Sequence, residues 1–211
     1  MELVSVLVRW AHLLFGITWI GMLYYFNFVQ GGYFKQASPE GLADAKAKLA
    51  PSALWWFRWG AMFTFITGVI LLEAVGRLHQ WNDFIAVGAL MGTLMFLNVW
   101  LIIWPNQKIA LGMKEGDGPT AAGKALLASR TNTLFSAPMA FGMIASPHWL
   151  SQSYGDPTGG GGIDLWIMIA IVALLEINAI VGKQGPLTSV KGVIHCSLAL
   201  TGVMIAILYF L

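Results

Sequence analysis

Residues 3–29 read LVSVLVRWAHLLFGITWIGMLYYFNFV, an apolar run in which Arg9 is the single charged side chain. A helix needs about 20 mostly apolar residues to cross a hydrocarbon layer roughly 30 Å thick. The run is longer than the core of a cleavable signal peptide, and no small-residue cleavage pattern follows it. The sequence therefore predicts a retained membrane-spanning helix.

Further apolar stretches of similar length follow this first one. The chain is 57% hydrophobic and 10% charged, and it lacks the period-2 alternation of a membrane barrel. We predict an all-α, polytopic membrane bundle of about six transmembrane helices, forming a single integral membrane domain over residues 1–211. The predicted spans are Leu3–Val29, Trp55–Val75, Phe84–Trp104, Leu126–Ala145, Ile163–Gly182 and Val190–Leu211.

The basic residues predict how the bundle is oriented. Ten of the twelve lysines and arginines fall on one side of the six spans, with only Arg9 and Arg77 on the other. Cytoplasmic loops carry an excess of positive charge. We therefore expect a multi-pass protein of the cell inner membrane with both termini outside, in the lipid bilayer that the apolar spans require.

The loops and small residues give two further expectations. Ser38 before Pro39 is a helix-start signal, which predicts a short helix to about Ala50. Gly118 is expected to open a helix that continues into the fourth span and is kinked near Pro138. Close helix packing is predicted at the small residues Gly60, Thr64, Gly68, Gly88 and Gly92.

His12 is the deepest of four histidines, the others being His79, His148 and His195. An imidazole among aliphatic neighbours needs a polar partner, because an unsatisfied polar group in hydrocarbon is costly. Two imidazoles from different helices make a six-coordinate haem b site suited to electron transfer. The alternative is a hydrogen bond from His12 to a neighbouring backbone carbonyl. His79 is expected to be an interfacial loop residue.

Arg9 and Gly16 lie on the same face of the first helix as His12, three residues before it and four after it. With a haem on His12, Arg9 would meet a propionate and Gly16 would leave room for the porphyrin. Otherwise Arg9 extends to the lipid headgroups.

A second set of polar residues lies toward the predicted cytoplasmic side. A carboxylate inside a span, such as Glu176, must be paired, protonated or solvated, and Arg58, Arg130 and Lys191 are candidate partners. The set is either a small-molecule pocket, a quinone site or a proton path, or else a structural polar network, which we prefer. Its members are Asn27, Arg58, Asn98, Arg130, Asn132, Glu176, Asn178 and His195.

Several other chemistries find no support in the sequence. The single cysteine, Cys196, excludes an internal disulfide and a c-type haem attachment site. There is no glycine-rich phosphate loop followed by lysine, no His-Glu-x-x-His and no Gly-x-Ser-x-Gly. The basic loops are explained by topology, so we expect no nucleic-acid partner.

Several stretches carry a family resemblance: residues 9–21 (RWAHLLFGITWIG), 56–59 (WFRW), 103–108 (IWPNQK), and the span from Asn132 through Pro138 to His148. Together they resemble the bacterial membrane-bound urate oxidase family, whose N-terminal membrane domain is followed in full-length members by a cytochrome c domain. This chain ends at Leu211, so we expect the membrane domain without that partner domain. Trp55, Gly60 and Ala86 stand where the family has further histidine and acidic positions.

The resemblance implies an integral membrane domain of redox type. His12 and His148 both fall on its motif positions, which makes them the expected axial ligands of haem b, with Arg9 and Gly16 completing the site. Because His148 is expected nearer the surface than His12, one helix must tilt or the turn at Pro147 must dip inward. The implied partner is a periplasmic cytochrome c or another subunit of a larger respiratory complex.

Three functional hypotheses follow. The first is a haem b protein that passes electrons to or from a periplasmic cytochrome c. The second is a urate or purine oxidase that uses the polar residues around Arg58, Asn98 and Glu176. The third is a haem-free structural accessory subunit of a membrane complex. Whether the protein is an enzyme is left open, and if it is one, it would be an oxidoreductase of the urate oxidase type.

Overall fold

The computed structural model describes residues 2–77, 81–148 and 161–211, and every regular element within these ranges is helical. The all-α prediction is therefore confirmed. In chain order the elements are α1 (Glu2–Tyr24), η1 (Tyr25–Gln30), α2 (Gly31–Gln36), α3 (Pro39–Asp44), η2 (Ala45–Leu49), α4 (Ala50–Arg77), α5 (Asp83–Leu97), η3 (Asn98–Ile103), α6 (Trp104–Ala110), α7 (Gly118–His148), α8 (Ile163–Val181), η4 (Gly185–Thr188) and α9 (Val190–Phe210). Elements η1, η2 and η3 are π-helical turns, and η4 is a 3₁₀ turn.

Five helical segments in the described residues are long and apolar enough to cross a membrane. They correspond to five of the predicted spans and confirm a multi-pass membrane protein. The sixth predicted span, Leu126–Ala145, lies within the 31-residue helix α7. At 1.5 Å per residue that helix is about 46 Å long, which is enough to cross a membrane. Its polar side chains make it less apolar than the other five segments, and it is therefore not counted with them. The five segments are Leu3–Gln36, Pro39–Ala74, Asp83–Ala110, Ile163–Val181 and Val190–Phe210.

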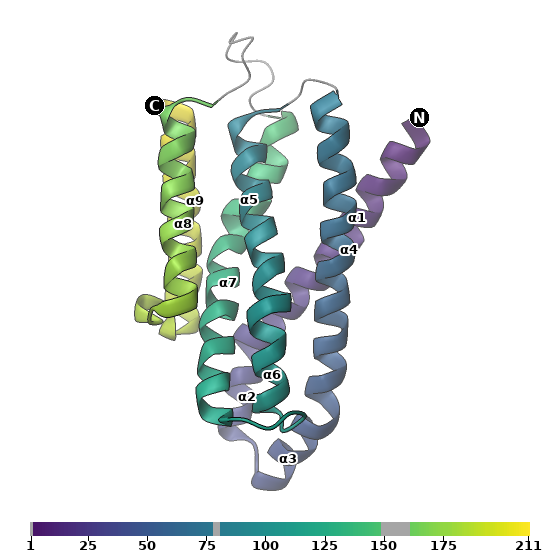
Figure 1. The fold of residues 1–211 in the computed structure, drawn as a ribbon, viewed down its shortest axis with the longest axis vertical. Helices are drawn as coiled ribbons and strands as arrows, with labels where there is room; N and C mark the ends of the chain where they lie inside the picture. The colour runs from purple at the N-terminus through teal and green to yellow at the C-terminus, as the bar shows by residue number, and fades with distance from the viewer. Residues whose placement is uncertain (1, 78–80, 149–160) are drawn as a thin grey trace.

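The long helices run side by side, except that α1 is inclined to the others (Figure 1). Helix α7 packs against α5, α6, α8 and α9, while α1 packs mainly on α4. The N- and C-termini lie at one end of the bundle, which we call the terminal end, and α2 and α3 lie at the other, the α3 end. Both termini thus lie at the same end, as the six predicted spans require. Which end faces outward stays a prediction.

Buried polar side chains run along α7 and form what we call the polar spine. Several of their hydroxyls bond carbonyls of their own helix, which satisfies them without water. Others reach α1 and η1: Ser136 shares a 2.8 Å hydrogen bond with Tyr24, and Ser129 accepts one of 2.8 Å from Asn27. The spine consists of Ser129, Arg130, Thr131, Asn132, Thr133, Ser136 and Ser146.

Glycines set the closest helix contacts. A Cβ at Gly142 would lie 2.6 Å from the carbonyl oxygen of Phe84, and one at Gly88 would lie 3.3 Å from that of Met139. Helices α5 and α7 therefore touch backbone to backbone. The packing role predicted for Gly88 is confirmed, and Gly142 is its partner across the interface.

The predicted helix starts are also present. Ser38 caps α3 by accepting a 3.1 Å hydrogen bond from the Gly41 N–H. The helix does not end near Ala50, because helical structure continues from α3 through η2 into α4. Helix α7 begins at Gly118, after Asp117, which accepts hydrogen bonds from the Thr120 hydroxyl and N–H. These bonds lower the pKa of the Asp117 carboxyl.

Adding a methyl group at the α5–α7 contact should destabilise the bundle. We expect Gly142→Ala to lower the free energy of unfolding by about 1–3 kcal/mol, because its Cβ meets a backbone oxygen that cannot move aside. The matched control is Gly123→Ala on the same helix, where a Cβ meets nothing within 4 Å and alanine gains up to about 1 kcal/mol of helix propensity. Unfolding midpoints in detergent measure both, and equal midpoints would contradict the contact.

Candidate functional site

A cavity of about 1580 Å³ opens at the terminal end of the bundle. Its walls are parts of α1, α4, α5 and α7, with the end of α9 and Asp164 of α8 at its rim. Ligand pockets usually measure roughly 300–1,000 Å³, so this cavity is large enough for a bulky cofactor. Most of its lining is apolar, including Phe65 and Leu72 of α4 and Met143 of α7.

Three of the four predicted site residues line this cavity. Arg9, His12 and Gly16 all face it from α1, at the spacing that the sequence predicted. Arg9 is exposed. A Cβ on Gly16 would approach no atom closer than the Thr64 Cγ2 at 4.0 Å, so this position leaves open space.

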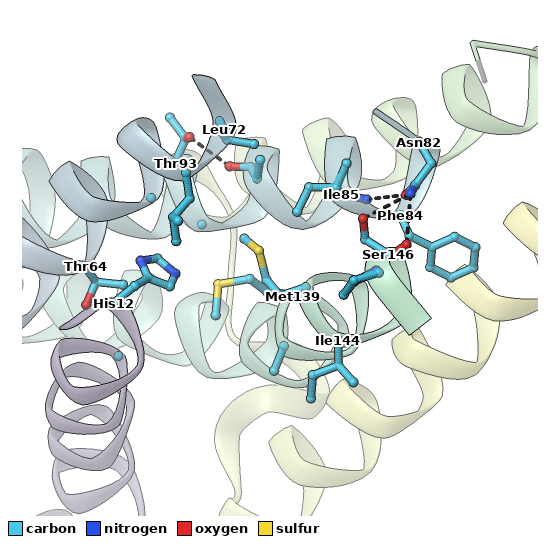
Figure 2. A pocket seen from close by; sticks show the side chains of 18 of the residues that line it. His12, Thr64, Leu72, Asn82, Phe84, Ile85, Thr93, Met139, Ile144 and Ser146 are labelled. Carbon is cyan, nitrogen blue, oxygen red and sulfur yellow. Dashed lines mark hydrogen bonds between the residues drawn. The ribbon is translucent and has the colours of Figure 1, made fainter. Parts of the chain in front are cut away.

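The fourth predicted residue, His148, is the last residue of α7. Its neighbours Ser146 and Pro147 line the cavity, but its side chain lies outside the described part of the structure, as does the whole of His79. Its role as a ligand therefore stays a prediction. Within the described part, the α7 wall opposite His12 presents Met139 (Figure 2). Sequence reasoning passed over this methionine because nothing in its spacing sets it apart from core residues.

The His12 ring lies against α4. Its Nδ1 is 3.0 Å from the Thr67 Oγ1, within hydrogen-bond distance. A Cβ at Gly68 would lie 3.2 Å from the His12 Cε1, so glycine makes space for the ring. The ring thus has a hydrogen-bond partner within the protein, but at Nδ1 this partner is the Thr67 hydroxyl and not the backbone carbonyl considered from the sequence. In the described part of the chain, Nε2 has no hydrogen-bond partner.

Asn82 links the start of α5 to the end of α7 by hydrogen bonds at the cavity. Its Nδ2 donates to the Ser146 carbonyl oxygen and Oγ at 3.2 and 3.0 Å, and its Oδ1 caps α5 by accepting from the Ile85 N–H at 3.1 Å (Figure 2). The start of α5 is thus fixed to the end of α7. The sequence signal for this residue was an asparagine directly before an apolar helix, which is a common N-cap pattern.

Part of the second polar set forms an amide cluster between three helices. Asn98 Nδ2 donates to Asn132 Oδ1 at 2.9 Å and to Glu176 Oε2 at 3.1 Å, and Asn132 Nδ2 donates to the Met95 carbonyl at 2.9 Å. Within the described residues, Glu176 forms no ion pair with any of the basic partners considered from the sequence. An amide, not a cation, is its neighbour, as in the structural network that we preferred.

Of the other members of that set, some have hydrogen bonds that explain their position, and others have buried polar atoms without a partner in the described residues. Asn178 bonds the Lys183 backbone at the end of α8, and His195 is exposed. Arg130 is only 8% exposed, yet its Nε and Nη1 have no partner in the described part of the chain. The Arg58 guanidinium stacks on Trp104, with Cζ 3.4 Å from the ring centre, and its buried Nη1 is also unpaired there.

Buried, unpaired guanidinium groups are costly, and each one calls for an explanation. The side-chain oxygens of Asn27 and Gln30 are buried and unpaired as well, within the described residues. The four side chains come from η1, the start of α4 and the first half of α7, in the half of the bundle nearer the α3 end, which we call the α3 half. We regard them as a second candidate binding place.

A metal ion held by protein side chains alone finds little support here. Among the described residues, no three histidine, cysteine or acidic side chains gather closely enough to hold one. A haem needs less from the protein, because the porphyrin supplies four ligands and the chain only one or two.

Comparison with known families shows which family this chain matches. The model described as urate oxidase N-terminal matches residues 77–184, just over half of the 211 residues. The matched segment contains α5, α6, α7 and α8, and thus one wall of the cavity and the amide cluster, whereas α1 and α4 lie outside it. No curated protein and no solved structure gives a significant match.

The unpaired state of Arg130 has a measurable consequence. Replacing a buried charge by an apolar side chain of similar volume is often neutral or stabilising by about 1–4 kcal/mol. We therefore expect Arg130→Met to raise the unfolding midpoint of the ligand-free protein in detergent. The control is Lys124→Met, an exposed position on the same helix, which should change stability by less than about 0.5 kcal/mol. A marked drop for Arg130→Met would mean that the guanidinium has a partner.

Proposed function

Because this chain belongs to the urate oxidase N-terminal family, we propose that it is a haem b-binding membrane redox protein that passes electrons to or from a periplasmic cytochrome c. The observation that carries the proposal is His12, whose ring faces a large and mostly apolar cavity between four membrane helices. Such a cavity, an axial imidazole and a cation at the rim are what a haem requires of a helical bundle.

The residues present fit such a group. His12 would be one axial ligand and His148 the other, while Arg9 at the rim would bind a propionate carboxylate by a charge-assisted hydrogen bond. Gly16 would leave space for the porphyrin. Pairing a deeper His12 with His148 requires a tilted helix, and the inclination of α1 supports this. When bound, haem b would supply one-electron transfer at its iron.

The chain's own side chains determine what such a site can do. The apolar walls from α4 and α7 would exclude water and keep the surroundings of low polarity. Held by His12 and His148 together, the haem would supply electron transfer and no binding position for a substrate. The cavity reaches the terminal end of the bundle. If that end faces outward, as the charge distribution predicts, a periplasmic cytochrome c would dock there.

A second candidate function, oxidation of urate or a related purine, is favoured by the unpaired groups in the α3 half. Arg58 and Arg130 offer unpaired donors, and Asn27 and Gln30 offer unpaired acceptors. A urate anion carries carbonyl oxygens for the first pair and ring N–H groups for the second. Hydroxylation of urate by water would remove two electrons, which two ferric cytochrome c molecules would accept, and would release two protons to the solvent.

The haem hypothesis is tested by a reduced-minus-oxidised spectrum of protein purified from cells supplied with haem. We expect a b-type α-band that His12→Ala and His148→Ala each abolish or shift, because each removes an axial ligand. His79→Ala is the control and should leave the band unchanged. If the wild-type protein shows no such band, the haem-free structural subunit is the remaining interpretation.

The second candidate is tested by following urate in the presence of ferric cytochrome c. Oxidation by this protein should consume urate and reduce two cytochrome c molecules for each urate lost. Arg130→Met should lower the rate, because it removes an anion-binding group, while Lys124→Met should not. If the haem-loaded protein consumes no urate, electron transfer is the function that remains.

A further inference from the structure

We propose that Thr67 is a positioning residue that holds His12 as the Nδ1–H tautomer and thereby presents the Nε2 lone pair to the cavity. This inference rests on the proposed function only in naming haem as the group that Nε2 would bind. The tautomer itself is a property of the protein without any ligand.

The direction of the hydrogen bond follows from the Thr67 hydroxyl. This hydroxyl has one hydrogen to donate. Its oxygen lies 2.6 Å from the Phe63 carbonyl oxygen and 3.0 Å from that of Thr64, so the hydrogen is engaged by carbonyls of its own helix. In its 3.0 Å contact with the His12 Nδ1, the hydroxyl must therefore accept, and the imidazole must donate.

The proton on Nδ1 determines where the lone pair of the ring lies. A neutral imidazole that is protonated at Nδ1 carries its lone pair at Nε2. The nitrogen without a partner in the described residues is thus the one able to bind a metal.

Helix α4 also fixes the ring in space. Thr64, Thr67 and Gly68 are spaced three and four residues apart, so they lie on one face of α4. Gly68 is close to the ring carbon Cε1, where a Cβ would come within 3.2 Å. The Nδ1 edge is therefore held against α4, while His12 itself lines the cavity.

This arrangement is the one that metal-binding histidines use. The ring nitrogen away from the metal usually donates to an oxygen, which sets the tautomer, orients the ring and raises the basicity of the ligand. Loss of such a partner typically costs about 10–100-fold in metal affinity. Thr67 is not part of the cavity wall, so its effect would reach a bound group only through His12.

The tautomer can be measured in the haem-free protein by ¹⁵N NMR of labelled histidine, with His12→Gln to assign the signal. We expect a protonated Nδ1 and an unprotonated Nε2 at a pH where the ring is neutral. Thr67→Ser should retain this state, since serine keeps the hydroxyl, and Thr67→Val should weaken it. A wild-type His12 protonated at Nε2 would overturn the inference, whatever the protein does with haem.

Titration with ferric haem b tests the consequence. We expect Thr67→Val to weaken haem binding by about 10–100-fold and to shift the midpoint potential, and Thr67→Ser to restore both. The control is Thr201→Val on α9, outside the cavity lining, where the hydroxyl likewise bonds the carbonyl of its own helix, at 2.9 Å. It should leave both values unchanged.

These experiments distinguish failure of the proposed haem function from failure of the positioning role of Thr67. If wild-type protein binds no haem but shows the Nδ1–H tautomer, the proposed function fails and the positioning role of Thr67 stands. If wild-type and Thr67→Val bind haem equally and with the same potential, the positioning role fails and haem binding stands. Unfolding midpoints in detergent will show that Thr67→Val and Thr67→Ser are comparably folded.

Discussion

The bundle depends on one constraint: polar groups inside a membrane must find partners within the protein, because hydrocarbon offers none. Helix α7 carries more buried polar side chains than a lipid-facing helix could, and its neighbours satisfy many of them. Asn27 in the π-helical turn η1 donates to Ser129, and Asn98 in the π-helical turn η3 donates to Asn132. Each of these two π turns therefore places one buried asparagine against α7. These two bonds fix α1 and α5 to the same central helix, and their loss would leave amides unpaired in the bundle interior.

The same anchoring explains why the cavity exists. At the C-terminal end of α1 and in η1, Tyr24 and Asn27 are hydrogen-bonded to α7. Toward the N-terminus α1 instead lies on α4, where Gly60 approaches the Trp19 backbone and Gly68 approaches His12. A helix held by one neighbour at one end and by another neighbour at the other must diverge from the first, and Figure 1 shows α1 inclined in this way. The space between α1 and α7 is the cavity, so the glycines of α4 and the asparagine of η1 together determine where a ligand could bind.

Much of this could be predicted from the sequence, because apolar length and small-residue spacing are local properties. The spans, the packing glycines and the face shared by Arg9, His12 and Gly16 all follow from patterns within one helix. What could not be predicted depends on contacts between helices. The stripe that includes Thr64 and Gly68 indicates close packing, but it does not say which helix packs there, and so the role of Thr67 was not visible.

The two candidate functions occupy different parts of one structure and therefore do not exclude each other. The His12 cavity opens at the terminal end, whereas the start of α4, which carries Arg58, and the start of α7 lie toward the α3 end. A substrate oxidised near Arg130 would release electrons inside the bundle, and a cofactor at His12 would stand between that place and the opposite surface. Helix α7 contributes to both, since Arg130 and Met139 are about two and a half turns apart on it. An arrangement of this kind would explain why this chain combines unpaired guanidinium groups with a separate apolar cavity.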